Sequence, residues 1–217
     1  WRPEIIKKYL KDLPEGSIMH YSDIGNHLNQ NGVQRLNDYV SMTEKYNMTV
    51  FEYGDPPVQF NNYNYKFQKY MEYQFTKADV LEYFNLTSDS KMFNSPQIWG
   101  GTFFLKKSNF SLSFLNQWEL ANKNTQLLDD SPSVNKNHKE FLGMRGCQSI
   151  FSLICKLNNV NKLSATECDW AENDRKRIWS HLNSYPILAK RDKQFGIFKR
   201  FLNRQKKTLN RYLQKLR

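Results

Sequence analysis

The residues of this chain that could do chemistry begin with an acid at the end of an apolar run. Residues 17–23 read Ser-Ile-Met-His-Tyr-Ser-Asp, and Gly25 follows two positions after Asp23. The run predicts a buried strand with Asp23 at its carboxyl end, where open α/β sheets bind their ligands. A carboxylate there can hold a divalent cation, and the cation can hold a diphosphate. The alternative is an Asx turn that ends the strand, with Gly25 supplying a permissive backbone.

A second candidate is the pair of adjacent carboxylates Asp129 and Asp130, in a turn-rich loop over residues 129–133. Two carboxylates in a loop can bind sugar hydroxyls or act as a general base. They can equally form a solvated turn or cap, since Asp is common in both.

A third candidate is Arg145, which precedes Gly146, Cys147 and Gln148 at the start of an apolar helix expected over 149–157. The N-terminus of a helix favours anions, and a guanidinium adds a forked cation. Gly100 and Gly101 form a fourth candidate inside a strand expected over 96–105. Paired glycines in a strand mark a bulge or a close backbone approach, often to a ligand.

The remaining reactive side chains give weaker signals. His20 lies inside the first strand and is expected to be packed, and Cys155 is expected to be buried on a helix face. The three cysteines match no zinc spacing, and an odd number does not build a disulfide framework, which favours a reducing cytoplasm. The sequence contains no HExxH, P-loop, GxSxG or GxGxxG motif.

Hydrophobic periodicity predicts the elements that must position these residues. Helices and strands alternate, which predicts a layered α/β domain over residues 1–189. The expected helices cover 3–12, 34–46, a segment with Thr76 as N-cap, 108–123 and 149–157, and the expected strands end at Asp23 or cover 48–53, 96–105 and 162–166. Residues 26–32 are expected to form a polar loop, and residues 59–75 carry no clear pattern.

The charge of the chain is concentrated at its end. Of 217 residues, 32 are Lys or Arg and 21 are Asp or Glu, for a net charge of +11. Residues 190–217 hold eleven of the basic residues and one acid, so the rest is close to neutral. Apolar residues recur there at helical spacing, which predicts a basic amphipathic helix. Such a helix can lie on an anionic membrane, pack on the domain, or bind nucleic-acid phosphates. No stretch has the length of a membrane span, and no signal peptide is recognisable.

Taken together, the motifs resemble a group of bacterial polysaccharide-biosynthesis glycosyltransferases of the capsule or O-antigen type. The resemblance covers most of residues 1–192, and its order and spacing are fairly specific. It rests on Trp1-Arg2-Pro3 and on residues 13–18, 21–25, 76–80, 95–101, 128–133, 145–155 and 163–167. The chain begins inside one of the family's motifs, so the upstream strand that would cradle the nucleotide base is expected to be missing.

The resemblance implies a GT-A-like nucleotide-diphospho-sugar transferase fold, with a mixed central sheet flanked by helices. Asp23 would correspond to the metal-binding acid of the family and hold Mn²⁺ or Mg²⁺. Asp129, Asp130 and Cys147 fall at catalytic positions. Donor or acceptor contacts would come from Trp1, Tyr21, Gly25, Lys77, Asp79, Gln97, Trp99, Gly100, Gly101, Arg145 and Gln148.

Two departures from the family pattern bear on activity. Gly25 stands where the second acid of the metal motif is expected, and Cys147 stands where relatives carry an acid before the last core helix. The expected activity is transfer of a sugar from a nucleotide-sugar donor, with UDP-sugars favoured, to a hydroxyl of a surface-polysaccharide acceptor, free or lipid-linked. The alternatives are an impaired relative that binds nucleotide or glycan without turnover, and a nucleic-acid-binding protein that uses the basic tail. We expect no nucleic-acid partner, and a cytoplasmic enzyme held by residues 190–217 at the inner face of the cytoplasmic membrane.

Overall fold

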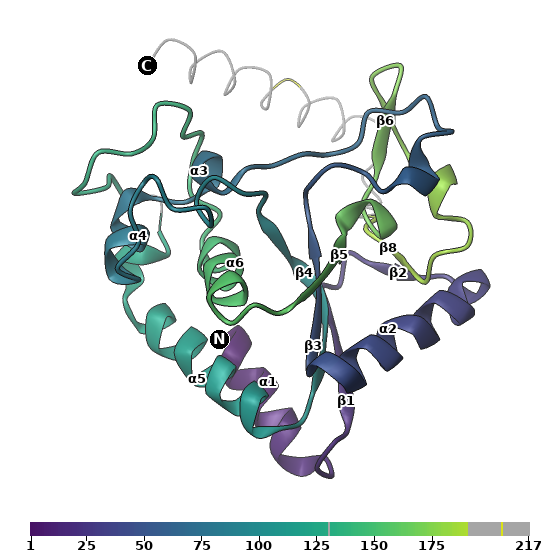
Figure 1. Ribbon diagram of the computed structural model, residues 1–217, viewed down its shortest axis with the longest axis horizontal. Helices are drawn as coiled ribbons and strands as arrows, with labels where there is room; N and C mark the ends of the chain where they lie inside the picture. The colour runs from purple at the N-terminus through teal and green to yellow at the C-terminus, as the bar shows by residue number, and fades with distance from the viewer. Residues whose placement is uncertain (130, 191–204, 206–217) are drawn as a thin grey trace.

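A four-stranded mixed sheet organises the protein, seen here in a computed structural model that describes residues 1–129, 131–190 and 205 (Figure 1). The strand order is β1-β4-β3-β5, with β4 antiparallel to both neighbours and β3 parallel to β5. The strands are β1 (Ile18–Ser22), β4 (Ile98–Lys106), β3 (Met48–Glu52) and β5 (Asn161–Ser164). The carboxyl ends of β1, β3 and β5 therefore share one edge of the sheet with the amino end of β4.

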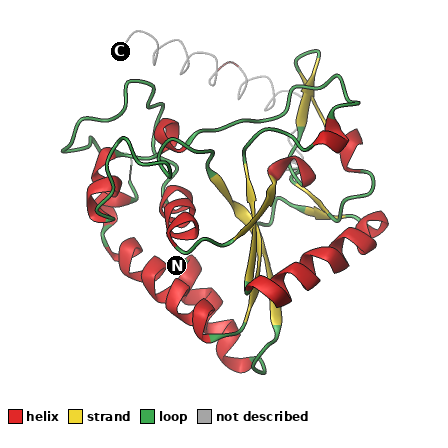
Figure 2. Ribbon diagram, in the orientation of Figure 1, coloured by secondary structure: helices red, strands yellow, loops and turns green. Residues whose placement is uncertain are grey.

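Helices cover both faces of the sheet (Figure 2). One face carries α1 (Arg2–Asp12), α5 (Asn109–Lys123) and α6 (Cys147–Leu157), and the other carries α2 (Val33–Tyr46). Short helices α3 (Glu72–Phe75) and α4 (Ala78–Tyr83) lie beside α6. Two small sheets pair β2 (His27–Leu28) with β8 (Ile187–Leu188) and β6 (Ala171–Asn173) with β7 (Lys176–Ile178). The structure also contains 3₁₀ turns η1 (Gln30–Gly32), η2 (Val58–Phe60), η3 (Thr125–Leu127), η4 (Ala165–Glu167) and η5 (Ser180–Leu182).

The side chains of β3 alternate between two hydrophobic cores, one on each face of the sheet. Met48 and Val50 point into the larger core under α1, α5 and α6, whereas Phe51 points toward α2. In the larger core Trp118 of α5 and Phe151 of α6 lie with ring centroids 4.8 Å apart. Full burial of each large side chain contributes on the order of 2 kcal/mol, so both faces hold the sheet.

Most of the elements predicted from periodicity are confirmed, with the helices and strands within a few residues of their expected bounds. Three details were wrong. Thr76 is not the N-cap of the next helix, because its hydroxyl donates to Glu72 and Lys77 takes the cap position. The expected loop 26–32 contains β2 and η1. The expected strand 162–166 ends at Ser164, whose hydroxyl accepts the N–H of Thr166 and starts η4.

The sheet and its helices confirm the α/β class with a mixed central sheet. The predicted basic helix falls on residues 190–217, which lie almost entirely outside the described residues. Within the described part of the chain, no helix combines the length and apolar character needed to cross a membrane.

Candidate functional site

Polar side chains from segments far apart in the sequence form a band along the shared strand edge. In strand order, Asp23 follows β1, Gln97 precedes β4, Tyr53 follows β3, and Asp169 comes after β5 and η4. Backbone hydrogen bonds join the strand ends, from Asp23 N to Gly101 O (2.8 Å) and from Tyr53 N to Gln97 O (2.9 Å). We call these residues, with Arg2, Gly100, Arg145 and Gln148, the edge band.

Asp23 forms one end of the edge band. Its Oδ1 accepts hydrogen bonds from Arg2 Nη2 at 3.2 Å and from the Tyr21 hydroxyl at 2.9 Å, and its side chain is 41% exposed. Asn26 N donates to Asp23 O at 2.9 Å, so a β-turn follows the strand and contains Gly25. A turn therefore follows the strand, but it is not the Asx turn of the alternative: the backbone oxygen of Asp23 closes it, Gly25 has no positive φ, and the carboxylate bonds Arg2 and Tyr21. Oδ2 takes part in neither side-chain contact.

Gln97 lies at the centre of the edge band and is fully buried. Its Oε1 accepts from Gln148 Nε2 at 2.9 Å and from Arg145 Nη1 at 3.4 Å. Gln148 Oε1 accepts from Gly100 N at 3.4 Å, and Arg2 Nη1 donates to Gly100 O at 3.1 Å. A continuous chain of hydrogen bonds therefore runs from Arg145 to Asp23.

Arg145 is held by aromatic rings. Its guanidinium carbon lies 3.8 Å from the ring centroid of Phe75 and 4.1 Å from that of Tyr70. Such cation–π contacts are worth about 0.5–2 kcal/mol and restrict the planar group to one orientation.

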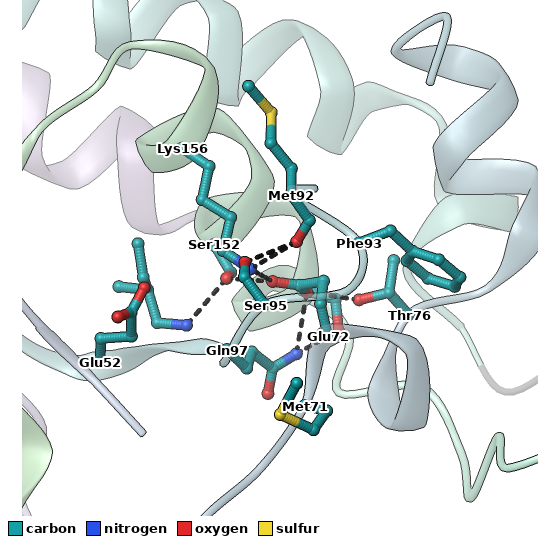
Figure 3. A network of polar contacts seen from close by, with 12 residues as sticks. Glu52, Met71, Glu72, Thr76, Met92, Phe93, Ser95, Gln97, Ser152 and Lys156 are labelled. Atoms are coloured by element: carbon teal, nitrogen blue, oxygen red, sulfur yellow. Dashed lines mark hydrogen bonds and ion pairs between the residues drawn. The ribbon is translucent and has the colours of Figure 1, made fainter. Parts of the chain in front are cut away.

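A buried ion pair lies behind Gln97 (Figure 3). Glu72 is fully buried, and its Oε2 accepts from Lys156 Nζ at 2.6 Å. Its Oε1 accepts from the Thr76 hydroxyl at 2.6 Å and from Gln97 Nε2 at 3.3 Å. Because the amide nitrogen of Gln97 faces this carboxylate, the amide oxygen faces Arg145 and Gln148.

Asp169 forms the other end of the edge band and is 8% exposed. Its Oδ2 accepts from the Tyr53 hydroxyl at 3.0 Å, and its Oδ1 accepts from Trp170 N at 2.8 Å. Burial raises the pKa of Asp169 to about 6, although these hydrogen bonds and the charges of Arg177 and Arg145 oppose the shift. Burial also raises the pKa of Tyr53 well above its ordinary value.

The loop after α5 carries Asp129. Its Oδ1 lies 3.1 Å from Nζ of the buried Lys77. Hydrogen bonds from the Ser131 hydroxyl and N–H, followed by that from Lys77, lower the pKa of Asp129. Gly146 has a positive φ of 54° and would place a Cβ 3.2 Å from Leu128 O, so this loop borders the segment that begins α6. Asp130 lies outside the described residues.

Other predicted residues serve local structure. Asp79 accepts the N–H groups of Val134 at 2.9 Å and Asn135 at 2.8 Å, which fixes the same loop over α4. A Cβ on Gly101 would lie 2.4 Å from the ring of Trp99, so this glycine makes room for that ring. Trp99 packs on the core beneath α2, on the other face of the sheet.

The last two predicted residues lie at the edge band's border. Trp1 is 66% exposed beside Arg2, whose guanidinium carbon is 5.6 Å from its ring centroid. Cys147 begins α6 and is partly exposed with a free thiol.

Sequence reasoning missed Arg2, Tyr53, Glu72 and Asp169 as members of the site. Arg2 belongs to the motif Trp1-Arg2-Pro3, and its charge could have marked it as the partner of Asp23. Glu72 and Asp169 lie outside the predicted helices and strands, whereas Tyr53 ends the strand predicted over 48–53. Nothing local marks any of the three side chains as part of a site, because their partners are distant in the chain.

No group of three His, Cys, Asp or Glu side chains with the spacing of a metal site occurs among residues 1–129 and 131–190. Comparison with known proteins adds nothing to the assignment, since no family model, curated protein or solved structure matches this chain.

Proposed function

We propose that the protein is a GT-A-like glycosyltransferase that takes a sugar from a nucleotide-diphosphate donor. The observation that supports this most is the edge band, where Asp23, Gln97, Gly100, Arg145 and Gln148 join in one hydrogen-bonded chain. The family resemblance assigned Asp23 to metal binding and the other four to donor or acceptor binding, although 122 positions separate Asp23 from Arg145. A shared edge of strand ends is also where open α/β sheets bind nucleotides.

The roles follow from charge. In the proposal, Arg145 and the N-terminus of α6 bind the donor phosphates, because both favour anions. Asp23 Oδ2 would be the single protein ligand of Mn²⁺ or Mg²⁺, and donor phosphates and water would complete its shell, as is common for Mg²⁺. The cation supplies neutralisation of the charge that develops on the leaving diphosphate.

The proposed reaction is glycosyl transfer to a hydroxyl of a surface polysaccharide. The acceptor oxygen forms a bond to the anomeric carbon, the bond from that carbon to the diphosphate oxygen breaks, and a carboxylate takes the hydroxyl proton. Residues 190–217 would hold the enzyme on an anionic membrane near a lipid-linked acceptor. Sedimentation of the full chain with anionic but not zwitterionic vesicles is the expected result, and equal sedimentation with both would refute this part.

Calorimetric titration with UDP- and GDP-sugars, with and without Mn²⁺, tests the proposal. We expect saturable binding of one nucleotide class and at least a tenfold loss in Asp23→Asn. Asp38→Asn is the matched control, since Asp38 is a half-exposed carboxylate that pairs with Arg35 at 3.1 Å on α2, which contributes no residue to the edge band. Absence of nucleotide binding, or equal binding by the two variants, would overturn the proposal.

A second candidate is an impaired relative that binds donor without turnover, and Cys147 is the observation that favours it. If this is correct, wild-type protein binds the donor without consuming it, and Cys147→Asp gains donor hydrolysis. Turnover by the wild-type protein would exclude this candidate.

A further inference from the structure

The carboxylates around the edge band differ in whether a positively charged side chain pairs with them. Asp23 pairs with Arg2, Asp129 with Lys77, and Glu72 with Lys156. Asp169 has no ion pair within 4.0 Å among the described residues, and its two oxygens accept one neutral donor each. Of the two carboxylates of the edge band, Asp23 and Asp169, only Asp169 has no ion pair with a described residue.

We infer that Asp169 is the carboxylate that accepts the proton of the incoming hydroxyl, a role that rests on the proposed glycosyl transfer. Asp169 lies at the opposite end of the edge band from the proposed metal ligand Asp23. A donor bound between these two residues would have its leaving diphosphate near Asp23 and its sugar near Asp169. Cys147, at the position where relatives carry an acid, is then not required as a base.

The contacts of Asp169 suit a base. Tyr53 holds Oδ2 from the end of β3, and Tyr53 itself is paired through its backbone with Gln97. A carboxyl whose partners are fixed by neighbouring strands keeps one orientation, which proton transfer requires.

The charged groups that face Asp169 come from each neighbouring element. Arg145 approaches from the start of α6 and Arg177 from β7, where it lies 4.2 Å from the ring centroid of Trp170. His181 of η5 contacts the backbone oxygen of Asp169 through Nε2 at 3.1 Å. The effect of burial on the pKa of Asp169 exceeds the opposing effect of the two arginines and gives a pKa of about 6. The carboxylate is therefore mostly ionised at pH 7 and remains basic enough to take a proton.

The step is balanced without a further reactant. The acceptor O–H bond breaks as the oxygen bonds to the anomeric carbon, the proton goes to an oxygen of Asp169, and the nucleotide diphosphate leaves with the electron pair of the broken bond. The protonated carboxyl then releases its proton to solvent before the next turnover.

The test measures donor binding and donor hydrolysis in the same full-length variants, with the nucleotide sugar that binds wild-type protein as the probe. Water then takes the place of the acceptor hydroxyl. Asp169→Asn should keep donor affinity within about threefold and lose hydrolysis by about 10²–10⁴-fold. The matched control is Asp174→Asn, in the exposed turn between β6 and β7, which should hydrolyse at the wild-type rate.

A second variant does not depend on whether Asp169→Asn folds. Tyr53→Phe removes a hydrogen bond that lowers the pKa of Asp169, so the acidic limb of the hydrolysis rate should move to higher pH. An unmoved limb, or wild-type hydrolysis by Asp169→Asn, would overturn the inference and leave the proposed function standing. Loss of donor binding in Asp169→Asn would also overturn it, by making the residue a binding or structural one. A wild-type protein that binds no nucleotide sugar would instead refute the proposed function, and the inference with it.

Discussion

The buried pair of Glu72 and Lys156 makes the sharpest prediction about stability. The Lys156 ammonium is 4% exposed and the Glu72 carboxylate is fully buried, so solvent screens neither charge (Figure 3). Lys156→Met removes the cation and leaves the carboxylate with neutral donors alone. Glu72→Gln keeps the shape of the side chain but leaves the ammonium unpaired.

Each single change should cost about 3–5 kcal/mol of unfolding free energy, because it strands one charge in a low-dielectric interior. The double variant Glu72→Gln/Lys156→Met strands no charge. It loses the bond from Lys156 to Met92 O (3.0 Å), which leaves a carbonyl short of a donor and should cost about 1–3 kcal/mol. The double variant should therefore be more stable than either single variant, with a coupling of about 3 kcal/mol or more.

The assay is urea unfolding followed by tryptophan fluorescence, with the slope of free energy against urea checked for constancy. Lys162→Met is the matched control, since Lys162 is 41% exposed and pairs with Glu52 at 2.8 Å. That variant should lose less than about 1 kcal/mol. Equal losses in Lys156→Met and Lys162→Met, or single losses that simply add in the double variant, would refute the argument that the pair is desolvated and coupled.

Three other changes test separate parts of the fold. Arg35→Lys should lose about 1–2 kcal/mol in urea unfolding, because a lysine cannot keep the two 2.8 Å bonds that the guanidinium makes to buried Glu167, and no loss would refute the forked geometry. Burial lowers the pKa of His20 to about 4, so the stability that the neutral imidazole contributes is fully present above pH 6.5 and is lost as pH falls through 4. Between pH 7 and 4, the unfolding free energy of the wild-type protein should fall by about 3 kcal/mol more than that of His20→Phe. Parallel curves of unfolding free energy against pH would contradict this. Gly32→Ala should lose about 1–3 kcal/mol by thermal unfolding, since its Cβ would lie 2.2 Å from the backbone nitrogen of Pro186, and an unchanged Tm would show that this contact is not close.

The elements that could be predicted from sequence are those whose residues repeat with a clear period. Helix α2 buries Tyr39 and Thr43 at i and i+4, and β3 alternates between the two cores, so each has a local pattern. Residues 59–75 have no such pattern because their aromatic side chains pack on distant ones. Phe60, for example, stacks on Tyr185 with ring centroids 5.6 Å apart.

The candidate site likewise contains residues that a local sequence feature marks and residues whose partners are distant in the chain. Asp23 could be predicted because a strand end is a local feature, and Arg145 because a helix start is one. Glu72 could not, since its cation lies 84 positions later, and Asp169 could not, because its neighbour Tyr53 lies 116 positions earlier. These contacts depend on the strand order. Because β4 lies antiparallel between β1 and β3, the start of β4 lies beside the ends of β1 and β3.

Gln97 gives the strongest reason to regard this edge as more than a polar surface. Its amide makes four hydrogen bonds, with Glu72 and Ser149 as acceptors and with Arg145 and Gln148 as donors, which uses its full capacity. Stability alone favours apolar residues at a fully buried position, because desolvating an amide is repaid only when every partner is in place. A network of this kind instead fixes the direction of one guanidinium and one side-chain amide at the open edge of the sheet. Donors held in advance need no reorganisation when an anion arrives, which is what the proposed donor site requires.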